Sequence, residues 1–350
     1  MKPRNFLLAA LILGAGLSAP LRADEGMWTF DNVPEDQLFE RHGFIPDRAW
    51  LEHARLASLR FSDGGSGSFV SPDGLVVTNH HIALGQLQKT SNAGRDYVKD
   101  GFYARTRAEE QPCPDLELNQ LVSYEDVTAT VLSGLPKGVP PAQVNEARRA
   151  AVAAVEKACS DATGLRCDVV ELYQGGEYWL YRYKKYTDLR LVMAPEVQAA
   201  FFGGNEDNFV YPRYNLDFAF FRVYEGGKPV RPAHFFPFSP AGPAEGELVF
   251  VTGHPGSTSR LLTMAQLAME RDVSGPYALR SLARARKARL EWSARGEEQA
   301  RQARDGLFGV ENSLKVRTGE LQGLSNGPLF ARKQAEEDAL RARVARDPAL

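Results

Sequence analysis

The chain has 350 residues, which is long for one domain and suits two domains. Hydrophobic residues make up 43% of it and charged residues 25%, which excludes a wholly disordered chain and a coiled-coil rod. The 42 basic residues nearly balance the 44 acidic ones, and the net charge of −2 argues against a dedicated nucleic-acid-binding protein. With only 3 cysteines, the fold must depend on a hydrophobic core rather than on a disulfide framework.

Residues 1–23 have the features of a secretory signal peptide. A basic start is followed by a mostly apolar stretch over residues 6–17 and by small residues up to Ala23. The apolar stretch is shorter than the roughly 20 residues of a membrane-spanning helix, which disfavours an N-terminal anchor. We therefore expect cleavage after Ala23 and a mature protein that is periplasmic or secreted and is not held in a membrane.

The cysteines of an exported protein meet an oxidising environment. Cys159 and Cys167 are close in sequence and form a candidate disulfide pair, which would leave Cys113 over. The sequence alone leaves the pairing open.

Residues 24–268 have the composition of a mostly β region. A Ser-Pro-Asp-Gly turn over residues 71–74 separates the runs 69–70 and 75–78, and it predicts a hairpin because proline fixes φ and glycine accepts a positive φ. Further strands are expected over residues 118–122, 127–132, 187–193, 216–224 and 247–252. One helix is expected over residues 141–159, where two prolines precede an alanine-rich run.

From residue 264 onward the composition changes to one typical of helices. Ala, Arg, Glu, Leu and Gln dominate, and an apolar stripe begins at Leu279 and Leu282. The arginines alone would suggest RNA binding, but acidic residues alternate with them, as on a solvated helix face. We therefore expect a helical domain over residues 269–350 and no nucleic-acid partner.

Two adjacent histidines, His80 and His81, follow the apolar run 75–78. A histidine at a strand end reaches the rim of a sheet on a rigid backbone, as a general base requires, and histidines titrate near neutral pH. The alternative interpretation is a turn histidine without a chemical role. No metal is expected, because neither a His-Glu-x-x-His motif nor a pair of Cys-x-x-Cys motifs occurs.

Asp217 is a single carboxylate within an apolar, strand-forming run. A buried charge is costly unless it is paired or hydrogen-bonded, so this aspartate needs a partner. The candidates are His81, Arg213, Arg222 and local backbone N–H groups. The glycine- and amide-rich loop at residues 203–208 lacks the ligand spacing of an EF-hand, and it would instead present Asn208 to a ligand.

Several segments occur in the order found in one peptidase family. They are residues 24–30, 67–81, 177–183 and 208–217, followed by 253–260 and 311–315. Together they resemble the bacterial exported dipeptidyl-peptidases of serine peptidase family forty-six, the family of dipeptidyl-peptidases 7 and 11. The resemblance covers nearly all of residues 24–340, and the ordered set is far more specific than any one piece.

The resemblance implies a mostly β fold with α-helices. Residues 24–268 would form a chymotrypsin-like β-barrel, the first of two, within the N-terminal part of the peptidase domain. Residues 269–350 would begin a helical domain that is inserted between the barrels and caps the cleft, with the second barrel absent from this chain. Members of the family are commonly dimers, which implies a homodimer.

The resemblance also implies roles for particular residues. By motif match His81 would be the base of a catalytic triad and Asp217 its carboxylate. Asn208 would hold the α-amino group of the substrate beside Phe209, and Asn312 would assist from the helical domain. The implied activity releases dipeptides from oligopeptides with a free N-terminus, and it needs no metal or organic cofactor.

The residue after the catalytic histidine departs from the family pattern. Relatives carry a cysteine there and another in the preceding strand, and the two form a disulfide. This chain has Ile82 at the first position and no cysteine near residues 65–67. The joint loss implies a deleted bridge, with burial of Ile82 offsetting part of the lost stability.

The nucleophilic serine is the second departure. In the family it lies in a Gly-Asn-Ser-Gly segment of the second barrel, and no serine of this chain has those surroundings. We therefore expect a C-terminally truncated dipeptidyl-peptidase that is inactive as the given chain alone. The alternatives are a non-catalytic pseudo-peptidase or fragment that binds peptide N-termini, and a hydrolase that uses Ser66 or Ser257.

Overall fold

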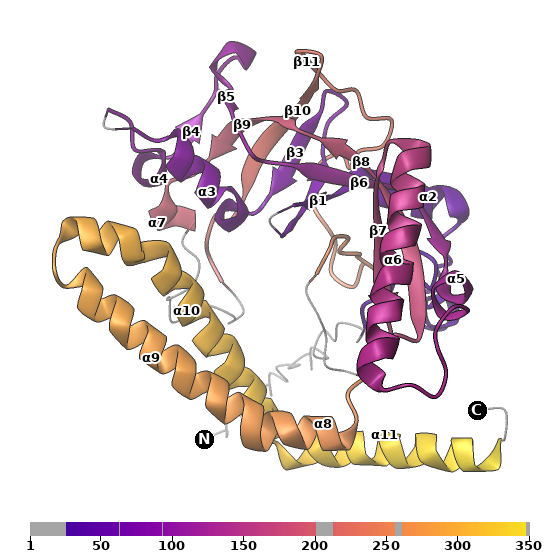
Figure 1. Cartoon of the computed structure of the whole chain (residues 1–350). Helices are drawn as coiled ribbons and strands as arrows, with labels where there is room; N and C mark the ends of the chain where they lie inside the picture. Colours follow the sequence, from indigo (N-terminus) through magenta and orange to yellow (C-terminus); the bar gives the residue numbers. More distant parts are fainter. Residues whose placement is uncertain (1–25, 63, 93, 201–212, 256–260, 348–350) are drawn as a thin grey trace, which may run out of the picture.

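The computed structural model describes residues 26–62, 64–92, 94–200, 213–255 and 261–347. Its centre is an antiparallel sheet flanked by helices, with a further group of helices below it (Figure 1). The strands are β1 (Ser58–Phe61), β2 (Ser66–Phe69), β3 (Leu75–Thr78), β4 (Phe102–Tyr103), β5 (Gln111–Pro112), β6 (Leu118–Asp126), β7 (Arg166–Leu172), β8 (Glu177–Tyr186), β9 (Asp188–Ala194), β10 (Ala219–Glu225) and β11 (Lys228–Pro229). The helices are α1 (Glu35–His42), α2 (Arg48–Ala57), α3 (His80–Thr90), α4 (Tyr97–Asp100), α5 (Thr128–Leu132), α6 (Pro141–Thr163), α7 (Val197–Ala200), α8 (Met264–Met269), α9 (Gly275–Ser293), α10 (Glu297–Leu324) and α11 (Gly327–Arg346), with short turns η1 (Arg107–Glu109) and η2 (Glu270–Ser274).

The strand order is β4-β9-β10-β3-β2-β1-β6-β8-β7, with β11 beside β10 and β5 beside β9. The predicted hairpin is confirmed as β2 and β3, and Gly74 in its turn has a φ of 76°. A Cβ at Gly74 would lie 3.0 Å from the carbonyl oxygen of Val223, so glycine is needed there for space as well as for φ. The strands expected over residues 118–122, 187–193 and 216–224 are present as β6, β9 and β10.

The described residues do not form the closed barrel that the family resemblance implied. β4 and β7 end the sheet without pairing with each other, so the sheet is open. Residues 128–132 form α5 rather than a strand, and the N–H of Thr128 donates to Oδ1 of Asp126 at 2.8 Å where the helix begins. Residues 247–252 find no strand beside them, and Val251 is 98% exposed.

The main core packs against the central strands of this sheet. Phe61, Phe69, Val76, Leu191 and Phe221 are fully buried in it. Less buried residues alternate with them along the strands, which is the pattern of a sheet with one face on the core. This core fixes the positions of β3 and β10, the two strands that lead into the candidate site.

The predicted helix is confirmed as α6, which continues to Thr163 and ends where Gly164 adopts a left-handed φ of 67°. α6 packs against β7 over a second core that includes Cys159 and Cys167. These two cysteines form the disulfide, with Cα atoms 6.1 Å apart, and Cys113 is free and buried. The disulfide joins the end of α6 to the strand that ends the sheet.

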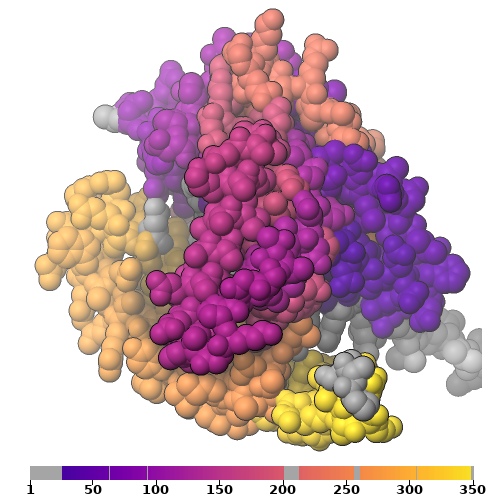
Figure 2. Space-filling model, turned by 45° about the vertical axis from the view of Figure 1, so that its right-hand side comes forward, coloured from indigo at the N-terminus to yellow at the C-terminus, as the bar shows by residue number. Residues whose placement is uncertain are grey.

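The helical composition from residue 264 onward is confirmed by α8 to α11. Thr263 begins α8 with a capping box that includes Gln266. α9 and α10 lie side by side, away from the sheet, and Arg286 on α9 pairs with Glu311 on α10 at 2.9 Å (Figure 1). In Figure 2 these orange and yellow helices fill the bottom of the molecule, below α6. Exposed ion pairs along them fit a solvated helix face.

Candidate active site

The register between β3 and β10 brings two distant parts of the chain together. These strands are antiparallel neighbours, with Ala219 opposite Thr78. Asn79 and α3 follow β3 directly, and Asp217 lies just before β10. Because β3 ends where β10 begins, the start of α3 and Asp217 lie side by side at the rim of the sheet.

Asp217 is hydrogen-bonded to both the ring and the backbone of His81. Nδ1 of His81 lies 2.8 Å from Oδ2 and 3.1 Å from Oδ1 of Asp217, and the N–H of His81 donates to Oδ1 at 3.0 Å. The Asp217 side chain is 13% exposed and the His81 side chain 36%. His81 is therefore a partner of this carboxylate, as expected, whereas Arg222 pairs with Glu110 and Asp73.

The start of α3 holds this carboxylate in its charged form. Asn79, at the N-cap position, donates from Nδ2 to Oδ2 and to the backbone oxygen of Asp217, both at 3.2 Å. Helix N-termini attract anions, because their first N–H groups have no partner within the helix. Burial alone raises the pKa of Asp217, but the hydrogen bonds and charge of His81 and the hydrogen bond from Asn79 outweigh it, so the pKa lies below its usual value.

This geometry selects one tautomer of the His81 ring. A carboxylate that accepts a hydrogen bond from Nδ1 requires the proton on that nitrogen, so in the neutral ring Nε2 carries the lone pair. A partly exposed histidine in this tautomer, with a buried carboxylate behind it, can take a proton from a hydroxyl group. The pair is therefore suited to general-base chemistry at the rim of the sheet.

Comparison with known proteins places the chain within a peptidase family. The family model for Peptidase S46 matches residues 23–350. The chain belongs to peptidase family S46. It is 32% identical over 372 residues to the dipeptidyl-peptidase 7 of Porphyromonas endodontalis, covering 99% of this chain and 44% of the relative. It is also 32% identical over 357 residues to the Asp/Glu-specific dipeptidyl-peptidase of Capnocytophaga gingivalis, covering 95% of this chain and 49% of the relative.

A solved structure shares the fold of this S46 chain. The crystal structure of Porphyromonas endodontalis DPP11 in complex with the dipeptide Arg-Glu matches with a TM-score of 0.75 and 24% identity, covering 93% of this chain and 50% of that one. The fold is thus the mostly antiparallel sheet with helices of that structure. The chain spans about half the length of the relatives that it matches.

The other predicted site residues of this S46 chain are not tested by the described contacts. Asn208, Phe209 and the loop 203–208 lie outside the described residues, as does Ser257, and their roles stay predictions. Asn312 lies half-buried on α10. Its role in substrate binding also stays a prediction.

Ser66 has a structural contact in β2. Its Oγ accepts a hydrogen bond from the N–H of His254 at 2.7 Å, and its backbone oxygen accepts one from Oγ1 of Thr78 at 2.8 Å. A serine nucleophile donates its hydroxyl hydrogen to the catalytic histidine, and the contacts described for Ser66 include none with His81. The contacts of Ser66 favour a role in holding the chain around residue 254 against the sheet.

Ile82 joins α3 to the chain before β2 by an apolar contact. A Cβ at Gly65, which has a φ of 105°, would lie 2.6 Å from Cδ1 of Ile82. Ile82 therefore lies directly over the backbone of Gly65, and it also packs against the main core. That this contact replaces a disulfide of the family stays a prediction from the resemblance.

His80 belongs to the interior rather than to the reacting surface. It is 2% exposed, and its ring is hydrogen-bonded to the backbone of Pro195. Burial lowers its pKa, so the ring is neutral at neutral pH. Of the two adjacent histidines, His80 anchors the first turn of α3 and His81 faces the rim.

Asn79 is a site residue that the motif match did not single out. Its signal in the sequence is its position directly before a helix, where amide side chains are common. Within the described residues, no group of three or more His, Cys, Asp or Glu side chains could hold a metal ion. In the same parts of the chain, no helix combines the length and the apolar character that crossing a membrane requires.

Proposed function

We propose that this chain is the histidine–aspartate part of a serine-type dipeptidyl-peptidase, which releases dipeptides from the free N-terminus of oligopeptides. One observation carries the proposal: Nδ1 of His81 lies 2.8 Å from Oδ2 of Asp217 in a chain of family S46. The names of the relatives, dipeptidyl-peptidase 7 and Asp/Glu-specific dipeptidyl-peptidase, support the class of reaction.

In the proposed reaction, the serine oxygen attacks the carbonyl carbon of the second substrate residue. Nε2 of His81 takes the proton of the serine hydroxyl in the same step. Asp217 stabilises the imidazolium that forms, because its carboxylate already accepts a hydrogen bond from Nδ1. His81 then gives the proton to the leaving amine, and water, activated by the same base, hydrolyses the acyl-enzyme. Backbone N–H groups stabilise the oxyanion in each step.

We place the nucleophilic serine outside these 350 residues. The relatives are about twice as long as the matched chain, and Ser66 accepts its hydrogen bond from the backbone of His254, which supports this placement. We assign the α-amino group of the substrate to Asn208 beside Phe209, with Asn312 assisting from α10. This part of the proposal rests on the family resemblance.

A first experiment tests where the nucleophile lies. Residues 24–350 are expressed and assayed for dipeptide release from fluorogenic dipeptide substrates, and are treated with a fluorophosphonate that labels activated serines. We expect neither turnover nor labelling. Turnover that His81→Ala abolishes would place the nucleophile within these residues, with Ser66→Ala and Ser257→Ala identifying which serine serves.

A second experiment tests the reaction itself. The protein produced from the whole gene, including any sequence beyond codon 350, is assayed with the same substrates. We expect dipeptide release that is lost in His81→Ala. Peptide binding without turnover in that protein would instead support a pseudo-peptidase and would overturn the catalytic proposal.

We also propose that the protein is exported. The S46 match begins at residue 23, close to the expected cleavage site after Ala23, and Cys159 and Cys167 form a disulfide. N-terminal sequencing of the protein from a periplasmic fraction should begin at Asp24. An N-terminus at Met1 in a membrane fraction would contradict export with cleavage.

A further inference from the structure

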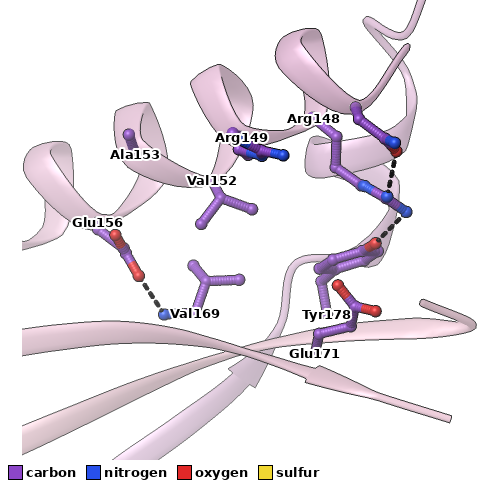
Figure 3. Close-up of a pocket in the computed structure, with 9 residues that line it drawn as sticks. Arg148, Arg149, Val152, Ala153, Glu156, Val169, Glu171 and Tyr178 are labelled. Carbon is purple, nitrogen blue, oxygen red and sulfur yellow. Dashed lines mark hydrogen bonds between the residues drawn. The ribbon is translucent and has the colours of Figure 1, made fainter. Parts of the chain in front are cut away.

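A pocket lies at the end of the sheet, apart from His81. It has a volume of about 470 Å³ and is bounded by α6 on one side and by β7 and β8 on the other (Figure 3). Strands β2, β1, β6 and β8 separate β7 from β3, which leads to His81. Pockets of this size commonly hold small molecules.

Arg148 on α6 is fixed in this pocket by neutral groups. Its Nη1 donates to the hydroxyl of Tyr178 at 3.1 Å, and its Nη2 donates to Oδ1 of Asn145 at 2.6 Å (Figure 3). Within the described residues, neither Arg148 nor its exposed neighbour Arg149 has an acidic group in salt-bridge range. An oriented guanidinium without a counter-charge can accept a carboxylate at little cost in ordering.

Three polar side-chain atoms lie close together beside Gly175, at the edge of the pocket. A Cβ at Gly175 would lie 3.1 Å from the hydroxyl of Tyr178, 3.4 Å from Nη1 of Arg148 and 3.4 Å from Oε1 of Glu171. Glu171 has no ion pair with any residue that the structure describes. The basic and acidic groups therefore face the same small space without pairing with each other.

The turn beside this point joins β7 to β8. Tyr173 and Gln174 have φ values of 49° and 57°, followed by Gly175 at 89°, and the N–H of Gly175 donates to the backbone oxygen of Leu172 at 3.1 Å. Two successive positive φ values are what a tight hairpin turn requires, so this turn fixes the position of Gly175 beside Arg148 and Glu171.

The remaining walls of the pocket suit an uncharged side chain. Val152 on α6 faces Val169 on β7, and Glu156 closes the other end by accepting the N–H of Val169 at 2.8 Å (Figure 3). The pocket thus combines two guanidinium groups, the carboxylate of Glu171 at one end, the carboxylate of Glu156 held by a backbone N–H at the other, and an apolar wall between them.

We propose that this pocket binds a small zwitterion of the amino-acid or dipeptide class. Arg148 and Arg149 hold the ligand's carboxylate, Glu171 holds its ammonium group, and the aliphatic wall contacts its side chain. The site is separate from the His81–Asp217 pair and does not depend on the proposed peptidase activity.

The test is a calorimetric titration of the protein produced from the whole gene with the dipeptide Ala-Ala. We expect saturable binding with a Kd of about 0.1–1 mM, as for a ligand with few contacts. Arg148→Gln should weaken binding about tenfold or more, and Arg149→Gln and Glu171→Gln about threefold or more, because each removes a charged contact. The matched control is Arg280→Gln, an exposed substitution on α9 that should leave the Kd unchanged.

Ligand analogues separate the two ends of the site. N-acetyl-Ala-Ala lacks the ammonium group, so it should bind the wild type more weakly than Ala-Ala does, and Glu171→Gln should remove that difference. Binding should persist in Asn208→Ala, which removes the side chain assigned to the substrate's α-amino group and so separates this pocket from the candidate active site. Absence of saturable binding, loss of binding in Asn208→Ala, or an unchanged Kd in both arginine variants would overturn the proposal. The exposed Arg149 keeps the test valid if Arg148→Gln does not fold.

Discussion

The carboxylate of Asp217 accepts hydrogen bonds from both the ring Nδ1 and the backbone N–H of His81. The backbone contact places an anion at the N-terminus of α3, and the ring contact orients the imidazole and fixes its tautomer. Because one carboxylate does both, helix stability and histidine orientation depend on the same group. A substitution of Asp217 should therefore change the stability of the fold as well as the proposed chemistry.

Asp217→Asn should lower kcat of the protein produced from the whole gene by about 10³–10⁴-fold. The amide can donate a hydrogen to Nδ1 of His81, which would select the tautomer without a lone pair on Nε2. Dipeptide release measured at several substrate concentrations separates this loss from a change in KM, which should be small. The control is Asp115→Asn, since the Asp115 side chain is 83% exposed and its φ of 64° suits asparagine. Activity that is reduced equally in both variants would contradict a specific role for Asp217.

The stabilising effect of Asp217 should depend on pH. Its folded pKa is lowered, so the ionised carboxylate stabilises the fold fully above the unfolded pKa of about 3.9, and this contribution is lost as the pH falls through the folded pKa. Urea unfolding of residues 24–350 should show a difference between wild type and Asp217→Asn that is complete at about pH 5 and shrinks below about pH 4. If the difference in unfolding free energy were the same at about pH 3 as at about pH 5, the lowered folded pKa of Asp217 would not be the origin of the stabilisation.

Local signals predicted the elements that depend on local chemistry. The Pro-Asp-Gly turn before Leu75 and the alanine-rich α6 are present where the sequence placed them. Residues 127–132 and 247–252 have equally strong β character, but a strand also needs a partner edge. The first run forms the short helix α5, and the second pairs with no strand among the described residues.

For the candidate site, too, the sequence predicted one part and missed another. A lone carboxylate in an apolar run predicts that Asp217 needs a partner, and the family resemblance selects His81. The register that joins Ala219 to Thr78 is a long-range property, and the contact of Asn79 with Asp217 depends on it. A single sequence predicts neither this register nor this contact, because hydrophobic patterning alone does not determine which strands pair.

Thiol chemistry should distinguish the three cysteines. Cys159 and Cys167 are bonded to each other, and burial raises the pKa of the Cys113 thiol to about 12, which disfavours the reactive thiolate. The native protein should therefore show no fast-reacting thiol at about pH 8, and one thiol per chain in denaturant without reductant. Replacing both Cys159 and Cys167 by alanine should lower the free energy of unfolding by about 2–3 kcal/mol. Three thiols in the denatured, unreduced protein would contradict the disulfide.

The contact between Ile82 and Gly65 should appear as coupling in a double-mutant cycle. Gly65→Ala would place a methyl group 2.6 Å from Cδ1 of Ile82 at a φ of 105°, so it should destabilise the wild type by about 2 kcal/mol or more. In an Ile82→Ala background the clash disappears and only the backbone strain remains, which should reduce that cost by about 1 kcal/mol. Urea unfolding of the four proteins measures the coupling.

Gly134→Ala provides the matched control, because no atom lies within 4 Å of a Cβ at Gly134. Its effect should add to that of Ile82→Ala without coupling, since the two sites share no contact. Equal costs of Gly65→Ala in both backgrounds would mean that Ile82 does not fill the position left by the deleted bridge. Coupling at Gly65 but not at Gly134 would show that an apolar side chain joins α3, and with it His81, to the chain between β1 and β2.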